Sequence, residues 1–152
     1  MNTLNAALES ALGKSISEVC DGAFHSNGSN HCAHFASHIA GIGFPFNCKQ
    51  FKGGTGTPAN VRVHEMFAEC PLVGAWADAD LTQELLVFVT KTSNVDLANK
   101  TIRNVPQKHV GIYSNGMVYH YSNSENEVVK WTPDQYLTRF EAAYSGAQGR
   151  YF

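Results

Sequence analysis

One cysteine and two histidines in this sequence have the residue types and the spacing that nucleophilic chemistry requires. Cys32 lies within NHCAHFASHIA, residues 30–40, and His109 and His120 lie within KHVGIYSNGMVYHYS, residues 108–122. In thiol catalysis a cysteine sulfur attacks an electrophilic carbon, an imidazole takes the thiol proton, and a third polar group orients that imidazole. The three residues are therefore candidates for a nucleophile, a base and an orienting residue.

Helical spacing predicts the environment of Cys32. With Asn30 as N-cap, a helix begins at His31 and runs to about Ala40, before Gly41. Its apolar residues form one buried stripe, which comprises Cys32, Phe35, Ala36, Ile39 and Ala40. We expect Cys32 to face the core from the first helical turn, where unsatisfied N–H groups and the helix dipole lower the pKa of a thiol. The alternative interpretation is a small residue that serves packing alone.

Strand geometry brings the two histidines together. Asn115 and Gly116 predict a two-residue hairpin turn. This turn pairs Ser114 with Met117, Tyr113 with Val118, and Gly111 with His120. His109 and His120 then become diagonal neighbours on one face of the hairpin, and Gly111 leaves room for the two imidazoles to meet. The alternative interpretation is a pair of histidines on a half-exposed sheet face.

The segments around these residues predict helices first and strands afterwards. LNAALESALGK, residues 4–14, has helical spacing and stops at Gly13, and a further helix is expected from about Asn60 to Glu69. Four short runs rich in β-branched and aromatic residues predict an antiparallel sheet. These runs are ELLVFVT (84–90), KHVGIYS (108–114), GMVYHYS (116–122) and NEVVKW (126–131).

The segment TPDQYLTRF, residues 132–140, predicts a C-terminal helix that closes the fold. Thr132 is its N-cap, Pro133 its first helical residue and Gln135 the partner of a capping box. This order of elements indicates an α+β fold. With 152 residues, of which 43% are hydrophobic and 16% charged, the chain is expected to form a single domain over residues 1–152.

Charge and hydropathy exclude several classes of protein. A formal net charge of -2 and scattered basic residues provide no field for a nucleic-acid backbone. No apolar run approaches the length of a membrane span, and the N-terminus lacks a Sec-type signal peptide. The four cysteines, Cys20, Cys32, Cys48 and Cys70, form no CxxC pair, so neither a zinc knuckle nor a thioredoxin motif is present. Reduced thiols are expected, although an oxidising compartment would allow two disulfides.

The segments SNHCAHFASHIAGIGF, HVGIY and VYHY resemble the NlpC/P60 superfamily of papain-like cysteine peptidases and amidases. The resemblance covers residues 25–45 and 84–122, and it implies a cysteine helix packed on a small antiparallel sheet. It also implies that Cys32 is the nucleophile, His109 the base and His120 the third polar residue. Two features depart from many members: His31 stands where Asp precedes the cysteine, and LTQELLVFV lacks a glycine-aspartate pair.

The resemblance also implies an activity. Most members of the superfamily hydrolyse peptide or amide bonds in peptidoglycan, without a cofactor, through a thioacyl enzyme. Backbone N–H groups near Asn30, His31 and Cys32 would hold the oxyanion, while Tyr113 and residues 53–57 would line the substrate cleft. A small chain without a signal peptide also resembles the amidase effectors of type VI secretion and phage-type lysis enzymes. We therefore expect a monomer, made in the cytoplasm and exported by a non-classical route, with a peptidoglycan peptide as substrate and an inhibitory immunity protein as partner.

Three alternatives remain open from the sequence. His31, His34 and His38 share one helix face opposite the stripe of Cys32, and imidazoles at this spacing can bind zinc, although the HExxH motif of metalloproteases is absent. A papain-like site can also carry out transamidation, acyl transfer or deamidation on a protein. Finally, the fold can serve as a binding module without catalysis.

Overall fold

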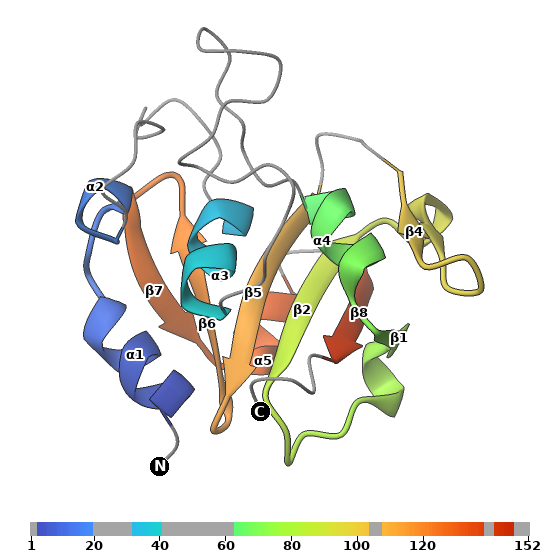
Figure 1. Cartoon of the computed structure of the whole chain (residues 1–152), viewed down its shortest axis with the longest axis horizontal. Coiled ribbons are helices and arrows are strands. Elements are labelled where there is room, and N and C mark those ends of the chain that lie inside the picture. Colours follow the sequence, from blue (N-terminus) through green and yellow to red (C-terminus); the bar gives the residue numbers. More distant parts are fainter. Residues whose placement is uncertain (1–2, 20–31, 41–62, 104–107, 139–141, 148–152) are drawn as a thin grey trace, which may run out of the picture.

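The central feature of the computed structural model is a six-stranded antiparallel sheet with the strand order β1-β8-β2-β5-β6-β7 (Figure 1). The structure describes residues 3–19, 32–40, 63–103, 108–138 and 142–147. The strands of the sheet are β1 (Leu72–Ala75), β2 (Leu85–Thr90), β5 (Lys108–Ser114), β6 (Met117–Ser122), β7 (Glu127–Trp131) and β8 (Ala142–Ala147). The predicted α+β class with a small antiparallel sheet is confirmed.

Helices lie on both faces of this sheet. Figure 1 shows α1 (Thr3–Ala11), α3 (Cys32–Ala40) and α4 (Val63–Glu69) in front of the sheet and α5 (Pro133–Leu137) behind it. The remaining elements are α2 (Ile16–Val19), the 3-10 helices η1 (Trp76–Asp78) and η2 (Thr92–Asn94), and a separate pair of strands, β3 (Val95–Asp96) and β4 (Thr101–Ile102). None of the helices in the described ranges has the length and apolar character needed to span a membrane.

The sheet separates two hydrophobic cores. The larger core joins α1, α3 and α4 to the inward-facing residues of the sheet, such as Val110, Ile112 and Tyr121. The smaller core joins Tyr136 of α5 to the opposite face, at Val87 and other residues. Because side chains alternate along a strand, one core receives Val110 and Ile112 and the other lies on the side of His109. All six residues of β2 are buried, since both faces of this central strand are covered.

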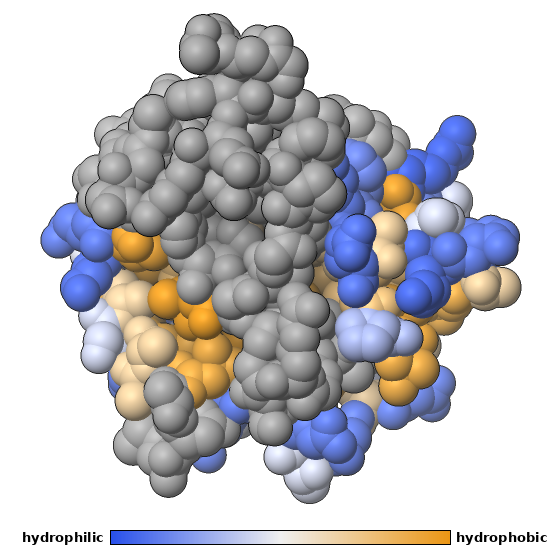
Figure 2. Space-filling model, in the orientation of Figure 1, coloured by the Kyte–Doolittle hydropathy of each residue, from blue (hydrophilic) through white to orange (hydrophobic). Residues whose placement is uncertain are grey.

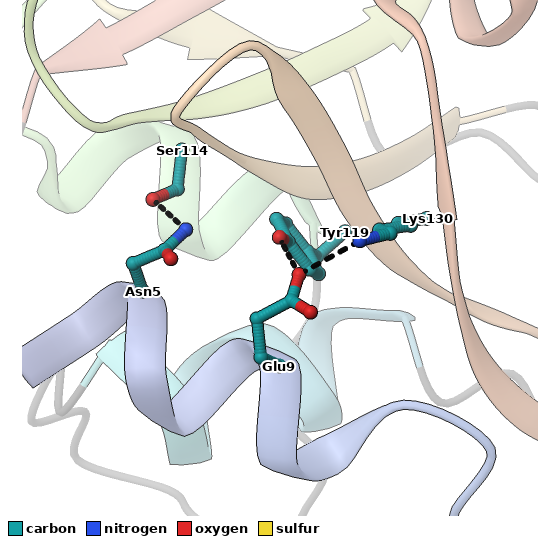
Figure 3. Close-up of polar contacts among 5 residues, drawn as sticks. All are labelled: Asn5, Glu9, Ser114, Tyr119 and Lys130. Atoms are coloured by element: carbon teal, nitrogen blue, oxygen red, sulfur yellow. Dashed lines mark hydrogen bonds and ion pairs between the residues drawn. The ribbon is translucent and has the colours of Figure 1, made fainter. Parts of the chain in front are cut away.

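Helix α1 is attached to the sheet by polar contacts as well as by apolar packing (Figure 3). Asn5 Nδ2 donates to Ser114 Oγ at 2.9 Å, and the Tyr119 hydroxyl donates to the carboxylate of Glu9. The same carboxylate is 2.9 Å from Lys130 Nζ. One helix thus contacts three neighbouring strands, β5, β6 and β7, and orders the half of the sheet that carries the two histidines.

Figure 2, in the orientation of Figure 1, shows hydrophilic residues over the β3–β4 hairpin at the right of the molecule.

Local signals predicted several elements closely. The helix expected at residues 31–40 is observed as Cys32–Ala40, and the helix expected from Asn60 is described from Val63 onward. The hairpin turn is confirmed, because Asn115 and Gly116 both have positive φ, at 51° and 86°. The capping box of α5 is also confirmed: Thr132 Oγ1 accepts from the N–H of Gln135, whose side chain accepts from the N–H of Thr132.

The prediction that a C-terminal helix closes the fold is wrong. After α5 the chain forms β8, which lies between β1 and β2 and pairs with β2 over six residues. The sequence of β8, AAYSGA, has none of the β-branched residues that mark strands. Its conformation comes from the open backbone edges of β1 and β2, which bind it on both sides. Strand β1 was not predicted either, because it too pairs with a strand that is distant in the chain, β8.

Candidate active site

Cys32 begins α3 and is buried, with 1% of its surface exposed. The predicted stripe is confirmed at Phe35 and Ala36, which are fully buried. Three backbone N–H groups lie within hydrogen-bonding reach of the thiol, those of Val110, Ala33 and Cys32 itself. The contact with Val110 places the sulfur beside the peptide unit that joins Val110 to His109.

The backbone pairing of β5 with β6 ends near this point. In the described strands their register covers only three pairs, Ile112 with Tyr119, Tyr113 with Val118, and Ser114 with Met117. Strand β5 nevertheless continues to pair with β2 as far as Lys108, and β6 continues to pair with β7 as far as Ser122. The N–H of Val110 that the Cys32 thiol contacts lies on β5 beyond the last of its pairs with β6. The thiol therefore lies next to the backbone of the residue that follows His109 in the chain.

Gly111 is the next residue of β5 after the last paired residue, Ile112, toward His109. The predicted pairs of Ser114 with Met117 and of Tyr113 with Val118 are confirmed, and Gly111 lies against His120 as the same register requires. A Cβ atom at position 111 would lie 3.1 Å from His120 Cβ and 2.9 Å from Val118 Cγ1. The absence of a side chain at Gly111 is thus required for the approach of His120.

His109 and His120 contact each other as predicted. His109 Nε2 lies 3.2 Å from His120 Nδ1, and the rings meet edge to face, with centroids 5.2 Å apart and planes at 85°. One of the two nitrogens carries the shared proton. When His109 Nε2–H donates to His120 Nδ1, the lone pair of His109 lies on Nδ1, which is then the basic atom.

Two aromatic side chains enclose His120, which is 3% exposed. The Trp131 and Tyr136 rings have centroids 4.4 Å and 5.0 Å from that of His120. Tyr136 is fixed in turn because its hydroxyl donates to the carbonyl of Val87 at 3.3 Å. Sequence reasoning missed both rings as parts of the site. A signal existed for Trp131, since it pairs with Val118, which shares a strand face with His120.

Burial determines the protonation of the pair. Desolvation lowers the pKa of His109 to about 4. It raises the pKa of the Cys32 thiol to about 11, although the neighbouring N–H groups and Lys108 act in the opposite direction. The predicted lowering of the thiol pKa was therefore wrong, because the cost of burying a thiolate exceeds what the first helical turn supplies. Near neutral pH the Cys32 thiol and the His109 imidazole are therefore both neutral.

A small cavity of about 120 Å³ adjoins the histidine pair. It is lined by His109, His120, Tyr121, Ser122, Asn123, Ser124 and Trp131. Its outer wall is the turn between β6 and β7, which is ordered by its own hydrogen bonds: Ser122 Oγ lies 3.2 Å from Ser124 Oγ and accepts from the N–H of Glu125 at 3.3 Å.

The other predicted site residues are placed differently. Tyr113 is on the same strand as His109 but at its far end, where it lines a separate cavity of about 640 Å³ together with Ser114, Glu84 and others. This cavity is not lined by Cys32, His109 or His120. Asn30, His31 and residues 53–57 lie outside the described residues.

No candidate metal centre is found in the part of the chain that the structure describes, where no three His, Cys, Asp or Glu side chains gather. His31 lies outside the described residues, as do the side chains of His34 and His38, so the predicted alternative of a zinc site at these histidines stays untested. Among the described residues, Cys32 and Cys70 are both buried and form no disulfide, and Cys20 and Cys48 lie outside this part of the chain.

Comparison with known proteins adds no assignment. No protein-family model matches the chain, and neither the curated proteins nor the solved structures contain a match.

Proposed function

We propose that this protein is a cysteine hydrolase of amide bonds with a papain-like site of the NlpC/P60 type. Cys32 is the nucleophile, His109 the base and His120 the residue that orients His109. The observation that supports the proposal is the contact of His109 Nε2 with His120 Nδ1 at 3.2 Å, beside Val110, whose backbone N–H contacts the Cys32 thiol. This order of groups matches the roles of a nucleophile, a base and an orienting partner.

The first half of the reaction forms a thioester. The Cys32 sulfur attacks the amide carbonyl carbon while its proton moves to His109 Nδ1. Because a pKa of about 11 for the thiol and about 4 for the imidazole disfavour the resting ion pair, this proton transfer accompanies C–S bond formation. His109 then gives the proton to the amide nitrogen, the C–N bond breaks, and the amine leaves.

The second half restores the enzyme. A water molecule gives a proton to His109 while the water oxygen attacks the thioester carbon. The C–S bond then breaks, the Cys32 sulfur regains the proton from His109, and the carboxylic acid is released. The transient imidazolium at His109 is stabilised by donation from Nε2 to His120 Nδ1. Backbone N–H groups at the start of α3, including that of Cys32, hold the oxyanion during both steps.

The proposed substrate is an amide bond in a peptidoglycan stem peptide. The similarity of the Cys32 and His109 segments to the NlpC/P60 superfamily supports this choice. An effector or lysis enzyme that acts on the cell wall, with an immunity protein as its inhibitor, is the corresponding biological role. Transamidation, acyl transfer and deamidation use the same thioacyl enzyme and differ only in the acceptor or in the amide attacked.

The test compares wild-type protein with Cys32→Ala on purified sacculi, followed by mass analysis of the released fragments. Cys70→Ala is the matched control, because Cys70 is also buried but donates to the carbonyl of Met66 at 3.3 Å, within its own helix turn. We expect new amine and carboxyl ends with wild type and Cys70→Ala, and none with Cys32→Ala. Intact stem peptides with all three proteins would contradict a peptidoglycan substrate, whereas fragments that carry an added acceptor would indicate a transferase.

A further inference from the structure

A second cavity, of about 640 Å³, lies apart from the histidine pair. Residues of α1, of the loop before β2 and of the β5–β6 hairpin line it, whereas Cys32, His109 and His120 do not. Its volume falls within the roughly 300–1,000 Å³ of cavities that hold small organic ligands. Size and position therefore allow a ligand here that is separate from the proposed hydrolysis.

Three buried polar side chains line this cavity and hold one another. Asn5 Nδ2 donates to Ser114 Oγ at 2.9 Å, as Figure 3 shows, and Ser114 Oγ donates to Glu84 Oε2 at 2.6 Å. Glu84 has 6% of its surface exposed, and Asn5 and Ser114 have less. Because these contacts fix the carboxylate of Glu84 before a ligand arrives, binding does not have to order it.

Glu84 gives the cavity a negative charge. Among the described residues that line the cavity, Glu84 is the one carboxylic acid, and none is a lysine, an arginine or a histidine. The donor from Ser114 is a neutral hydroxyl, which stabilises the carboxylate without cancelling its charge. A carboxylate that is largely removed from bulk water attracts a cation more strongly than one in water. The cavity therefore favours a cation and disfavours an anion.

The groups around the carboxylate indicate the kind of cation. The fork of a guanidinium group pairs best with both oxygens of a carboxylate, and one oxygen of Glu84 already accepts from Ser114. An ammonium group needs one carboxylate oxygen and can donate its other protons to neutral oxygens, which the cavity provides in its hydroxyls and carboxamides. Leu81 and Tyr113 add apolar surface against which a carbon chain can pack.

We propose that the 640 Å³ cavity binds a primary alkylammonium group, with the charged nitrogen at Glu84 and the carbon chain against Leu81 and Tyr113. A free amine and the side chain of a lysine in a peptide both present this group. The inference does not depend on the proposed hydrolysis, because none of the three proposed catalytic residues lines the cavity.

The first measurement varies only the charge of the ligand. Pentylamine, pentan-1-ol and pentanoate have chains of the same length, and each is titrated at pH 7 while the backbone amide signals of Asn115 and Gly116 in the cavity lining are followed by NMR. We expect pentylamine, protonated at this pH, to bind at least about tenfold more tightly than the alcohol or the acid. Equal binding of pentylamine and pentan-1-ol would overturn the inference, and so would the absence of any shift.

The second measurement tests the carboxylate. Glu84→Gln keeps the size of the side chain and an oxygen that accepts from Ser114 but removes the charge. Asp78→Asn is the matched control, because it removes an exposed carboxylate that does not line this cavity. We expect pentylamine binding to weaken at least about tenfold in Glu84→Gln and less than about twofold in Asp78→Asn. Equal losses would overturn the inference, since the general negative potential and not Glu84 would then attract the amine.

The third measurement distinguishes the two sources of the ammonium group. Lysine with an acetylated α-amine and a methylamide at its carboxyl represents a lysine within a peptide, and its affinity is compared with that of pentylamine. Tighter binding of the blocked lysine supports a peptide as the ligand, and tighter binding of pentylamine supports a free amine. Cys32→Ala protein should bind either compound as wild type does, so a failure of the proposed hydrolysis leaves this inference standing.

Discussion

His109 Nε2 and His120 Nδ1 lie 3.2 Å apart, although 11 positions separate the two residues in the chain. The hairpin turn supplies this proximity, and the thiol of Cys32 contacts the backbone of Val110, the residue after His109. A histidine that donates to a second histidine keeps one nitrogen available as a base. Consequences of this arrangement for stability and reactivity can be measured independently of any substrate.

The depressed pKa of His109 makes stability depend on pH. The unfolded state takes up a proton near pH 6.5, whereas the folded state does so only near pH 4. The contribution of His109 to the free energy of unfolding is therefore fully present above pH 6.5. It is lost as the pH decreases toward 4, by about 2 kcal/mol in total for this partly buried ring. Denaturant unfolding of wild type and His109→Gln at pH 7 and pH 4.5 measures the effect. The loss between these pH values should be smaller in the variant, and equal losses would contradict the pKa shift.

The raised pKa of Cys32 predicts slow alkylation at neutral pH. Because only the thiolate reacts, the rate with iodoacetamide should increase with pH up to about 11. The alkylation rate of a free thiol such as glutathione, measured in parallel, should reach its plateau at a lower pH, near the pKa of that thiol. Mass analysis of the modified peptide assigns the reaction to Cys32. A plateau already at pH 7 would indicate an activated thiolate at rest, contrary to the buried neutral thiol.

Gly111 should not tolerate a side chain. A Cβ atom there would approach the carbonyl oxygen of Tyr119 to 3.0 Å and His120 Cβ to 3.1 Å, so Gly111→Ala should reduce stability by about 1–3 kcal/mol. It should also perturb the NMR signals of the His120 ring. Gly74→Ala is the matched control, because among the described residues no atom beyond its chain neighbours lies within 4 Å of its added Cβ. Equal effects of both substitutions would show that strand propensity, and not the contact with His120, is responsible.

Tyr136 should stabilise the histidine pair mainly through its ring. Tyr136→Phe removes only the hydrogen bond to the carbonyl of Val87 and should cost about 1 kcal/mol. Tyr136→Ala removes the ring beside His120 and should cost about 3–5 kcal/mol, as for other large aromatic residues in cores. Urea unfolding gives both values. The ring also orients His120. The rate of the proposed amide hydrolysis should therefore be kept in Tyr136→Phe and should decrease strongly in a Tyr136→Ala protein that still folds.

Ser114 joins α1 to the loop before β2. Its hydroxyl donates to the buried carboxylate of Glu84 at 2.6 Å and accepts from Asn5 Nδ2 at 2.9 Å. Ser114→Ala removes this link and should destabilise the protein by about 2 kcal/mol, since a buried carboxylate loses a donor. Ser124→Ala, at an exposed position, should change stability by less than about 0.5 kcal/mol. Thermal and urea unfolding of the two variants provide the comparison.

Much of the local structure and the core of the candidate site were predictable from the sequence. The apolar stripe through Cys32 and Phe35 gave the face of α3, and Asn115–Gly116 gave the hairpin register that brings His109 to His120. The capping box at Thr132 gave the start of α5. These features depend on interactions between residues close in the chain, and their periodicities and turn residues are visible in the sequence.

Only the tertiary structure decided the remaining features. The insertion of β8 depends on the open edges of β1 and β2, and the aromatic enclosure of His120 depends on Tyr136 arriving from the opposite layer. The thiol pKa depends on how completely Cys32 is buried, which outweighs the local effect of the helix terminus. Desolvation and strand insertion depend on groups that are distant in the chain, so the spacing of residues in the sequence does not predict them. The sequence by itself therefore determined which residues could react, and the packing of the layers determined their protonation and their surroundings.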